Sequence, residues 1–140
     1  AQVSAIYLCA VAGTTTISYA VTTSCGTDIA TRVVTVNVMA PHTNITVHPS
    51  SVICANAQYQ NFGAEQAPPA GLNYAWSATN ASVYATSPDK QNAVVNFDTV
   101  GTAIVRLTTQ ITATGCFVTD SFVVTINSTP AYTPEVKYFA

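Results

Sequence analysis

The sequence predicts an all-β fold in which a β-sandwich module is repeated along the chain. Three observations lead to this prediction: an internal repeat, short runs of alternating apolar and polar residues, and the absence of long stretches with helical periodicity. The residue usage agrees, because Thr and Val are abundant and such β-branched residues are enriched in strands.

The internal repeat is the strongest of these signals. Residues 13–37 and 101–127 both begin with Gly-Thr, contain one cysteine near their middle, and end with Val-Val-Thr, an aliphatic residue and Asn. The glycines are 88 residues apart, the cysteines Cys25 and Cys116 are 91 apart, and the final asparagines are 90 apart. Each copy therefore predicts a β-hairpin, and the small change in spacing falls around its turn.

Between the two copies, short strand candidates alternate with turns that contain proline or glycine. The turns are indicated by Pro49, by Pro68-Pro69-Ala70-Gly71 and by Ser87-Pro88-Asp89. Five candidates and the second hairpin give seven strands, the number found in an Ig-like β-sandwich. We therefore expect an Ig-like β-sandwich in tandem array. The five candidates are Thr43–Val47, Val52–Gln60, Leu72–Ser77, Ser82–Ala85 and Ala93–Phe97.

The repeat also predicts a division of the chain into one complete domain and two partial ones. Residues 41–128 are expected to form a complete Ig-like β-sandwich domain, and residues 1–40 match only the C-terminal half of such a domain. Residues 129–140 are expected to be the first strand of a following domain or an inter-subunit strand. The partial domains are completed either within a longer array or by neighbouring chains through strand addition.

The composition argues against several classes of function. The 140 residues include only four Lys and Arg and six Asp and Glu, for a formal net charge of −2. Nucleic-acid binding is not expected, because neutralising phosphates requires clustered basic residues. No apolar run approaches the roughly 18 residues of a transmembrane helix. The first residues do not form a signal peptide, so any export signal is expected outside this sequence.

Several motifs resemble a known group of repeats. These are Gly13–Tyr19 with Thr23–Thr27, Ile53-Cys54-Ala55, Tyr74-Ala75-Trp76-Ser77, and Gly115-Cys116. Together they resemble the PKD-like and bacterial Ig-like repeats found in large surface proteins of Bacteroidota. The resemblance implies a structural repeat of an extracellular, cell-surface protein such as an adhesin, stalk or filament. The partners it implies are neighbouring domains of the same array, or copies of the chain in a filament.

The four cysteines, Cys9, Cys25, Cys54 and Cys116, are disulfide candidates. None forms a Cys-x-x-Cys pair, which argues against a zinc site or a thioredoxin-like redox motif. Cys54 and Cys116 should lie at opposite ends of the domain, because a strand such as Thr102–Ile111 spans roughly 33 Å and bonded cysteines have Cα atoms within about 7 Å. One hypothesis is therefore a set of inter-domain disulfides that join Cys9 to Cys116 and Cys54 to a counterpart of Cys25. Pairs within a domain and free thiols remain alternatives.

The aromatic residues, histidines and aspartates are not expected to form a binding or metal site. Trp76 and Tyr74 alternate on one predicted strand and are expected in the core. The other tyrosines are spread along the chain, so the sequence does not indicate a carbohydrate-stacking face. His42 and His48 lack an adjacent cysteine or acidic cluster, and the aspartates do not have the spacing of a calcium loop. No metal or cofactor is expected.

Five residues are candidates for glycosylation. Asn44, Asn80 and Asn127 begin Asn-x-Ser/Thr sequences, which are acceptors for N-glycans. The resemblance to Bacteroidota proteins implies O-glycosylation instead, at Thr99 in Asp98-Thr99-Val100 and, as a weaker match, at Ser121 in Asp120-Ser121-Phe122. Thr99 precedes a turn glycine and should be exposed.

The sequence therefore predicts a non-enzymatic chain whose role is mechanical or in assembly, since nothing in it supplies a nucleophile with a base. Two alternatives belong to other classes: a glycan- or protein-binding module, and an accessory domain of a secreted enzyme. For a binding module, surface glycans and a host or substratum are the further candidate partners.

Overall fold

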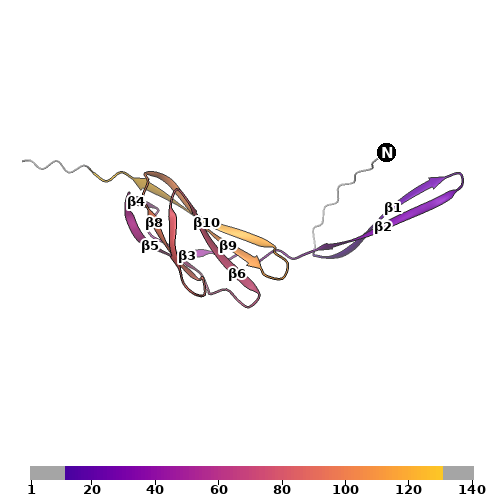
Figure 1. The fold of residues 1–140 in the computed structure, drawn as a ribbon, viewed down its shortest axis with the longest axis horizontal. Helices are drawn as coiled ribbons and strands as arrows, with labels where there is room; N and C mark the ends of the chain where they lie inside the picture. Colours follow the sequence, from indigo (N-terminus) through magenta and orange to yellow (C-terminus); the bar gives the residue numbers. More distant parts are fainter. Residues whose placement is uncertain (1–11, 131–140) are drawn as a thin grey trace, which may run out of the picture. The chain divides into compact units, whose positions relative to one another are not determined.

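The computed structural model describes residues 12–130, and these residues form β-strands connected by turns and loops (Figure 1). The chain divides after Met39 into two compact units, Ala1–Met39 and Ala40–Ala140. Ten strands are present in the described part, β1 to β10. Within residues 12–130 no helix is long and apolar enough to cross a membrane.

The first unit contains a single antiparallel hairpin. Strands β1 (Gly13–Thr23) and β2 (Gly26–Val36) are paired along their whole length, from Gly13 with Val36 to Thr23 with Gly26. Ser24 and Cys25 form the two-residue turn between them. The Cys25 backbone N–H donates to Thr23 Oγ1 at 3.3 Å, which holds the turn in shape.

The second unit contains two four-stranded sheets. All strand pairs in it are antiparallel except β4 with β10, which is parallel. The first sheet has the order β4 (Val52–Cys54), β10 (Phe117–Asn127), β9 (Gly101–Ile111) and β6 (Leu72–Thr79); the second has the order β3 (Ile45–Val47), β5 (Ala57–Ala64), β8 (Asn92–Phe97) and β7 (Ser82–Thr86).

The two sheets enclose one hydrophobic core between them. Alternate residues of β9 and β8 are at most 1% exposed, as expected for strands that turn one face inward. Phe62 of β5 lies among aromatic neighbours from both sheets: its ring centroid is 6.2 Å from that of Phe97 and 6.1 Å from that of Phe122. The second unit therefore has two layers, in the manner of a β-sandwich. Its fully buried side chains include Phe62, Tyr74, Val95, Phe97, Val105, Leu107 and Val124.

The segment that leads into β3 is fastened to the first sheet by two side chains. The hydroxyls of Thr43 and Tyr74 form a buried hydrogen bond of 3.2 Å. Asp120 of β10 accepts the backbone N–H of Ile45 on Oδ2 at 2.8 Å, and its Oδ1 lies 3.7 Å from His42 Nε2. These contacts connect residues from the two sheets and fix where the chain enters the sandwich.

One predicted strand is in fact two. The candidate Val52–Gln60 is divided at Ala55 and Asn56 into β4 and β5, which belong to different sheets. Asn56 has a φ of 63°, a left-handed conformation that Asn adopts more readily than most residues and that reverses the chain direction. The Ala55 N–H bonds to the Asn127 carbonyl at 2.7 Å, which extends the β4–β10 pairing up to the turn.

Candidate functional site

The β1–β2 hairpin reproduces the pairing of the β9–β10 hairpin. Gly13 pairs with Val36 in the first, and Gly101 pairs with Ile126 in the second, at the equivalent positions of the repeat. The difference lies in the turn: two residues separate Thr23 from Gly26, whereas four separate Ile111 from Cys116, whose carbonyl accepts the Ile111 N–H at 2.9 Å. The internal repeat is therefore a repeat of strand register.

The two hairpins differ sharply in burial. In β9, Ala103, Val105 and Leu107 are 0% exposed because they face the core. Tyr19, the counterpart of Leu107, is 50% exposed, although it lies on the equivalent face of β1. We call this surface the hairpin face. Its β1 residues are Thr15, Ile17, Tyr19 and Val21, and the register places Asp28, Ala30, Arg32, Val34 and Val36 of β2 on the same face.

The faces of the two hairpins that lie opposite to those compared above are similarly exposed. Val33 of β2 and its counterpart Val123 of β10 are both well exposed, at 63% and 51%. The outward face is thus solvent-facing in both copies, and only the inward face differs. Within the first unit, Tyr19 and Val21 of the hairpin face are exposed, at 50% and 44%, whereas Ile17, Val34 and Val36 are half-buried.

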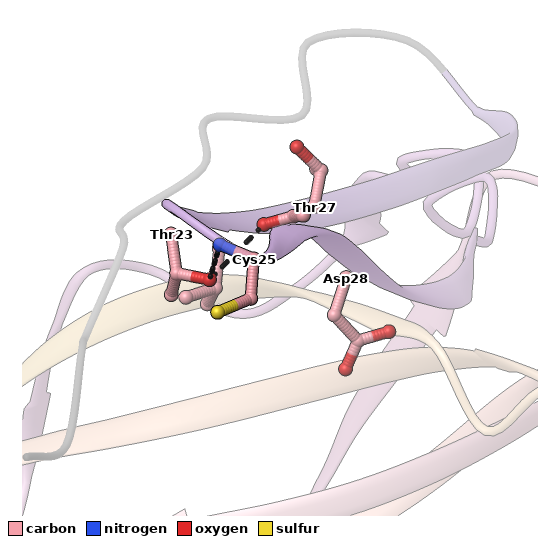
Figure 2. A pocket seen from close by; sticks show the side chains of 6 residues that line it. Thr23, Cys25, Thr27 and Asp28 are labelled. Carbon is pink, nitrogen blue, oxygen red and sulfur yellow. Dashed lines mark hydrogen bonds between the residues drawn. The ribbon is translucent and has the colours of Figure 1, made fainter.

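The tip of the β1–β2 hairpin forms a shallow depression of about 460 Å³ (Figure 2). It lies over the turn and brings a thiol, hydroxyls and one carboxylate together. Thr22 and Thr27 share a hydroxyl hydrogen bond of 3.0 Å across the two strands. The chemistry available at this tip is disulfide formation by an exposed thiol and hydrogen bonding by threonines. The lining residues are Val21, Thr23, Cys25, Gly26, Thr27 and Asp28.

The three cysteines that the structure describes are free thiols in three separate places. Cys25 is exposed at the hairpin tip, and Cys54 is exposed at the end of β4. Cys116 directly precedes β10, whereas Cys54 is paired with Asn127 at the far end of that strand. Cys54 and Cys116 therefore lie at opposite ends of the sandwich. Cys9 lies outside the described residues.

Tyr74 and Trp76 both point toward the core but are buried to different degrees. Tyr74 is 0% exposed, and Trp76 is partly buried and packs against the core cluster. The Trp76 indole N–H donates to the Lys90 carbonyl at 2.9 Å. This bond draws the polar end of the ring toward the turn before β8, at the edge of the core.

The two candidate O-glycosylation sites have different surroundings. Thr99 is exposed in the turn between β8 and β9, where no strand pairing restricts access to it. Ser121 is also exposed, but it lies within β10 and is paired with Arg106 of β9. Its neighbour Asp120 is held by the Ile45 N–H. Thr99 is the more accessible of the two.

The three candidate N-glycosylation residues are all exposed. Asn44 precedes β3 and donates from Nδ2 to Glu65 Oε2 at 3.2 Å. Asn80, with a φ of 55°, lies in the turn between β6 and β7 and donates to the Thr102 carbonyl at 3.4 Å. Asn127 ends β10. None of these positions lies in the core.

The histidines contact different partners. His48 stacks on the ring of Phe122, with centroids 3.9 Å apart, and His42 lies near Asp120. Residues 12–130 contain no group of three or more His, Cys, Asp or Glu side chains placed to hold a metal ion.

Two exposed tyrosines that are distant in the sequence meet on the second sheet. The rings of Tyr59 and Tyr84 are 5.2 Å apart between centroids and nearly perpendicular, at 85°. This pair was not predicted, because β5 and β7 are separated by β6 along the chain and become near neighbours only across β8.

Comparison with known proteins adds no relative. A scan against protein-family models finds no matching family, and a search of curated proteins finds no match. The geometry of the chain and its sequence pattern are therefore the basis for the function proposed below.

Proposed function

We propose that this chain is a structural repeat segment of an extracellular bacterial surface protein, such as an adhesin, stalk or filament. The observation that carries the proposal is the second copy of one hairpin register, in which Tyr19 and Val21 are exposed at positions whose counterparts in β9 are buried in the core. A hairpin of two strands is marginally stable alone, so this face is suited to contact further strands. The chain then carries parts of at least two modules of one kind.

The strand order supports modules of the Ig-like type. In an Ig-like sandwich, strands A, B, E and D form one sheet and strands C, F and G form the other. Assigning β3, β5, β8 and β7 to the first set, and β6, β9 and β10 to the second, gives that arrangement. β4 is then an additional short edge strand beside β10.

The pairing of β4, the second strand of this unit, with β10, its last strand, supports a mechanical role. β4 and β10 are parallel, with Thr125 opposite Val52 and Asn127 opposite Cys54. Tension applied to the two ends of this unit would pull β4 and β10 in opposite directions along their lengths. Their hydrogen bonds would then be loaded together in shear, and they would not open one after another. The Ser51 carbonyl accepts the Thr125 N–H at 2.7 Å in this set of bonds.

The connector between the units also fits a load-bearing array. Only residues 37–39 lie between the end of β2 and Ala40, which is buried at 6% exposure. Pro41 follows directly and restricts the backbone because its ring fixes φ. A short connector that is fastened to the sandwich at Thr43 and Ile45 would transmit force with little slack.

The remaining strands of the β1–β2 module have two candidate sources. They belong either to the same array or to a neighbouring copy that contributes strands in trans. The exposed cysteines at the ends of the modules are candidates for inter-domain disulfides in both arrangements.

Electron microscopy of the native full-length protein tests the proposal. We expect a rod or fibre with a regular axial repeat of roughly 40 Å, because an eleven-residue strand spans about 37 Å. Isolated compact particles without a repeat would contradict a role as an array segment.

A further inference from the structure

The Tyr59–Tyr84 pair is produced by irregularities in two strands. In β5 the pairing with β8 shifts between Ala57 and Gln60, and Tyr59 lies within this bulge. In β7 the pairing with β8 shifts between Val83 and Ala85, and Tyr84 lies within that bulge. Since both bulges flank the same strand, they bring the two rings together over the outer surface of the second sheet.

The backbone at Tyr59 is held in an unfavourable conformation. Its φ is 56°, in the left-handed region that residues with a Cβ atom rarely adopt. The Tyr59 N–H has left the regular ladder and donates to the Asn96 side-chain Oδ1 at 2.7 Å. A bulge of this kind redirects a side chain, and such features concentrate at functional sites.

Core packing does not account for this conformation. Tyr59 is 60% exposed and Tyr84 is 63% exposed, so most of both rings faces solvent. The edge-to-face arrangement leaves ring faces open, because each ring covers at most one face of the other. The strained backbone therefore presents an open aromatic surface and adds little to the core.

The surroundings of the pair are polar and carry no positive charge. Ser82 is paired with Asn96, whose amide also accepts the Tyr59 N–H, and Gln58 precedes Tyr59. The Gln58 amide donates to the Asp98 carboxylate, the single charged group in this set. The basic residues of the described chain lie on other elements: Arg32 in β2, Lys90 before β8, and Arg106 in β9.

The aromatic rings and the polar groups around them favour one chemical class of ligand. Open aromatic faces pack against apolar ring surfaces, while amides, a hydroxyl and a carboxylate hydrogen-bond to hydroxyl groups. A phosphate- or sulfate-bearing ligand would lack a cationic partner and would face Asp98. We propose that Tyr59 and Tyr84, with Gln58, Ser82, Asn96 and Asp98 around them, form a binding site for a neutral glycan. The proposal is independent of the structural role argued above.

Binding of the full chain to an array of neutral hexose and N-acetylhexosamine oligomers, with sulfated glycans, phosphorylated glycans and peptides on the same array, tests the site. Calorimetric titration with the best binder follows. We expect Tyr84→Ala to weaken binding about tenfold, since an aromatic contact contributes roughly this factor. Tyr84→Phe keeps the ring and should bind within about threefold of the unmodified chain. Phe117→Ala, at an aromatic side chain of similar exposure at the start of β10 in the other sheet, is the matched control and should leave affinity unchanged.

Three results would overturn the site. The first is that no neutral oligomer on the array binds. The second is that binding persists unchanged in Tyr84→Ala, whose thermal unfolding is measured alongside to show that it is folded. The third is that only sulfated or phosphorylated glycans, or only peptides, bind at this pair.

Discussion

At the residue scale, the hydroxyl of Tyr74 shows how a single polar atom is accommodated in the core. Tyr74 is fully buried, and its hydroxyl bonds with that of Thr43, so the polar ends of both side chains are satisfied. Across the described residues no buried side-chain N or O atom lacks a partner. The core is therefore apolar except where a hydrogen bond offsets the loss of water.

Replacing this hydroxyl should leave its partner unpaired. We expect Tyr74→Phe to lower the free energy of unfolding by about 1–3 kcal/mol, because the Thr43 hydroxyl would remain buried without a bond. Urea denaturation followed by circular dichroism measures the change. The double variant with Thr43→Val should lose less than the sum of the two single changes. Tyr84→Phe, at an exposed ring, is the control and should unfold as the unmodified chain does.

Asp89 provides a pH-dependent test in the turn before β8. The hydrogen bond from the Ser87 hydroxyl, followed by that from the Gln91 N–H, holds the pKa of Asp89 below its ordinary value of 3.8. The ionised carboxylate therefore favours the folded turn. This contribution is present above pH 3.8 and is lost as the pH falls through the lowered pKa. A carboxyl-carbon NMR titration should show that Ser87→Ala raises the Asp89 pKa toward 3.8. Ser121→Ala, on β10, should leave it where it was, and an unchanged pKa in Ser87→Ala would contradict the assignment.

The sequence predicted which side chains face the core but not how deeply each of them is buried. Tyr74 and Trp76 were expected in the core on the basis of alternation, and both point inward. The alternation of apolar and polar residues shows on which side of a strand a side chain lies. How deeply that side chain is buried depends on the elements that pack against that side. The Trp76 N–H reaches the Lys90 carbonyl 14 residues away, and that contact exists only once β6 and the turn before β8 are assembled.

At the scale of elements, the hairpins could be predicted because they are local. Their strands are long, their pattern is regular, and the repeat supplied each with a second example. The division of Val52–Gln60 into β4 and β5 was missed, because membership of a sheet depends on partners remote in sequence, such as Asn127. The bulges at Tyr59 and Tyr84 were missed for the same reason, and with them the aromatic pair.

The difference in burial between the two hairpins should appear in hydrogen exchange. We expect amides of β9–β10 to exchange only on global unfolding, because the hairpin is paired on both edges and covered by the core. Amides of β1–β2 in the same chain should exchange at least about a hundredfold faster, since a two-stranded hairpin is marginal in water. Mass spectrometry on peptides from the two hairpins measures both at once. Equal protection would mean that the hairpin face is covered in this chain.

The parallel pair of β4 and β10 can be tested under force. Ala55→Pro removes the N–H that bonds to the Asn127 carbonyl, and we expect it to lower the unfolding force of the second unit in single-molecule pulling from its ends. Ala67→Pro, in an exposed loop outside the strands, is the matched control and should unfold at the original force. If both variants unfold at the force of the unmodified chain, β4 and β10 do not bear the load.

At the scale of the whole molecule, the positions of the cysteines restrict how chains are linked. Cys54 and Cys116 are separated by the length of β10, roughly 35 Å, whereas a disulfide requires Cα atoms within about 7 Å. Under oxidising conditions we therefore expect no Cys54–Cys116 bond within one chain. Peptide mapping without reduction checks this, and a parallel sample treated with a reductant identifies the linked peptides. Recovery of that bond from monomeric chain would show that the sandwich had rearranged.

The turns of the two hairpins indicate where the protein accepts change. One turn has two residues and the other has four, yet the strands on either side keep the same register. Extra residues at this point are therefore accommodated without altering the sheet. The loop between Ile111 and Cys116 is a suitable place to insert a short epitope or a fluorophore-binding peptide, which would mark the position of this unit in the rod or fibre proposed above.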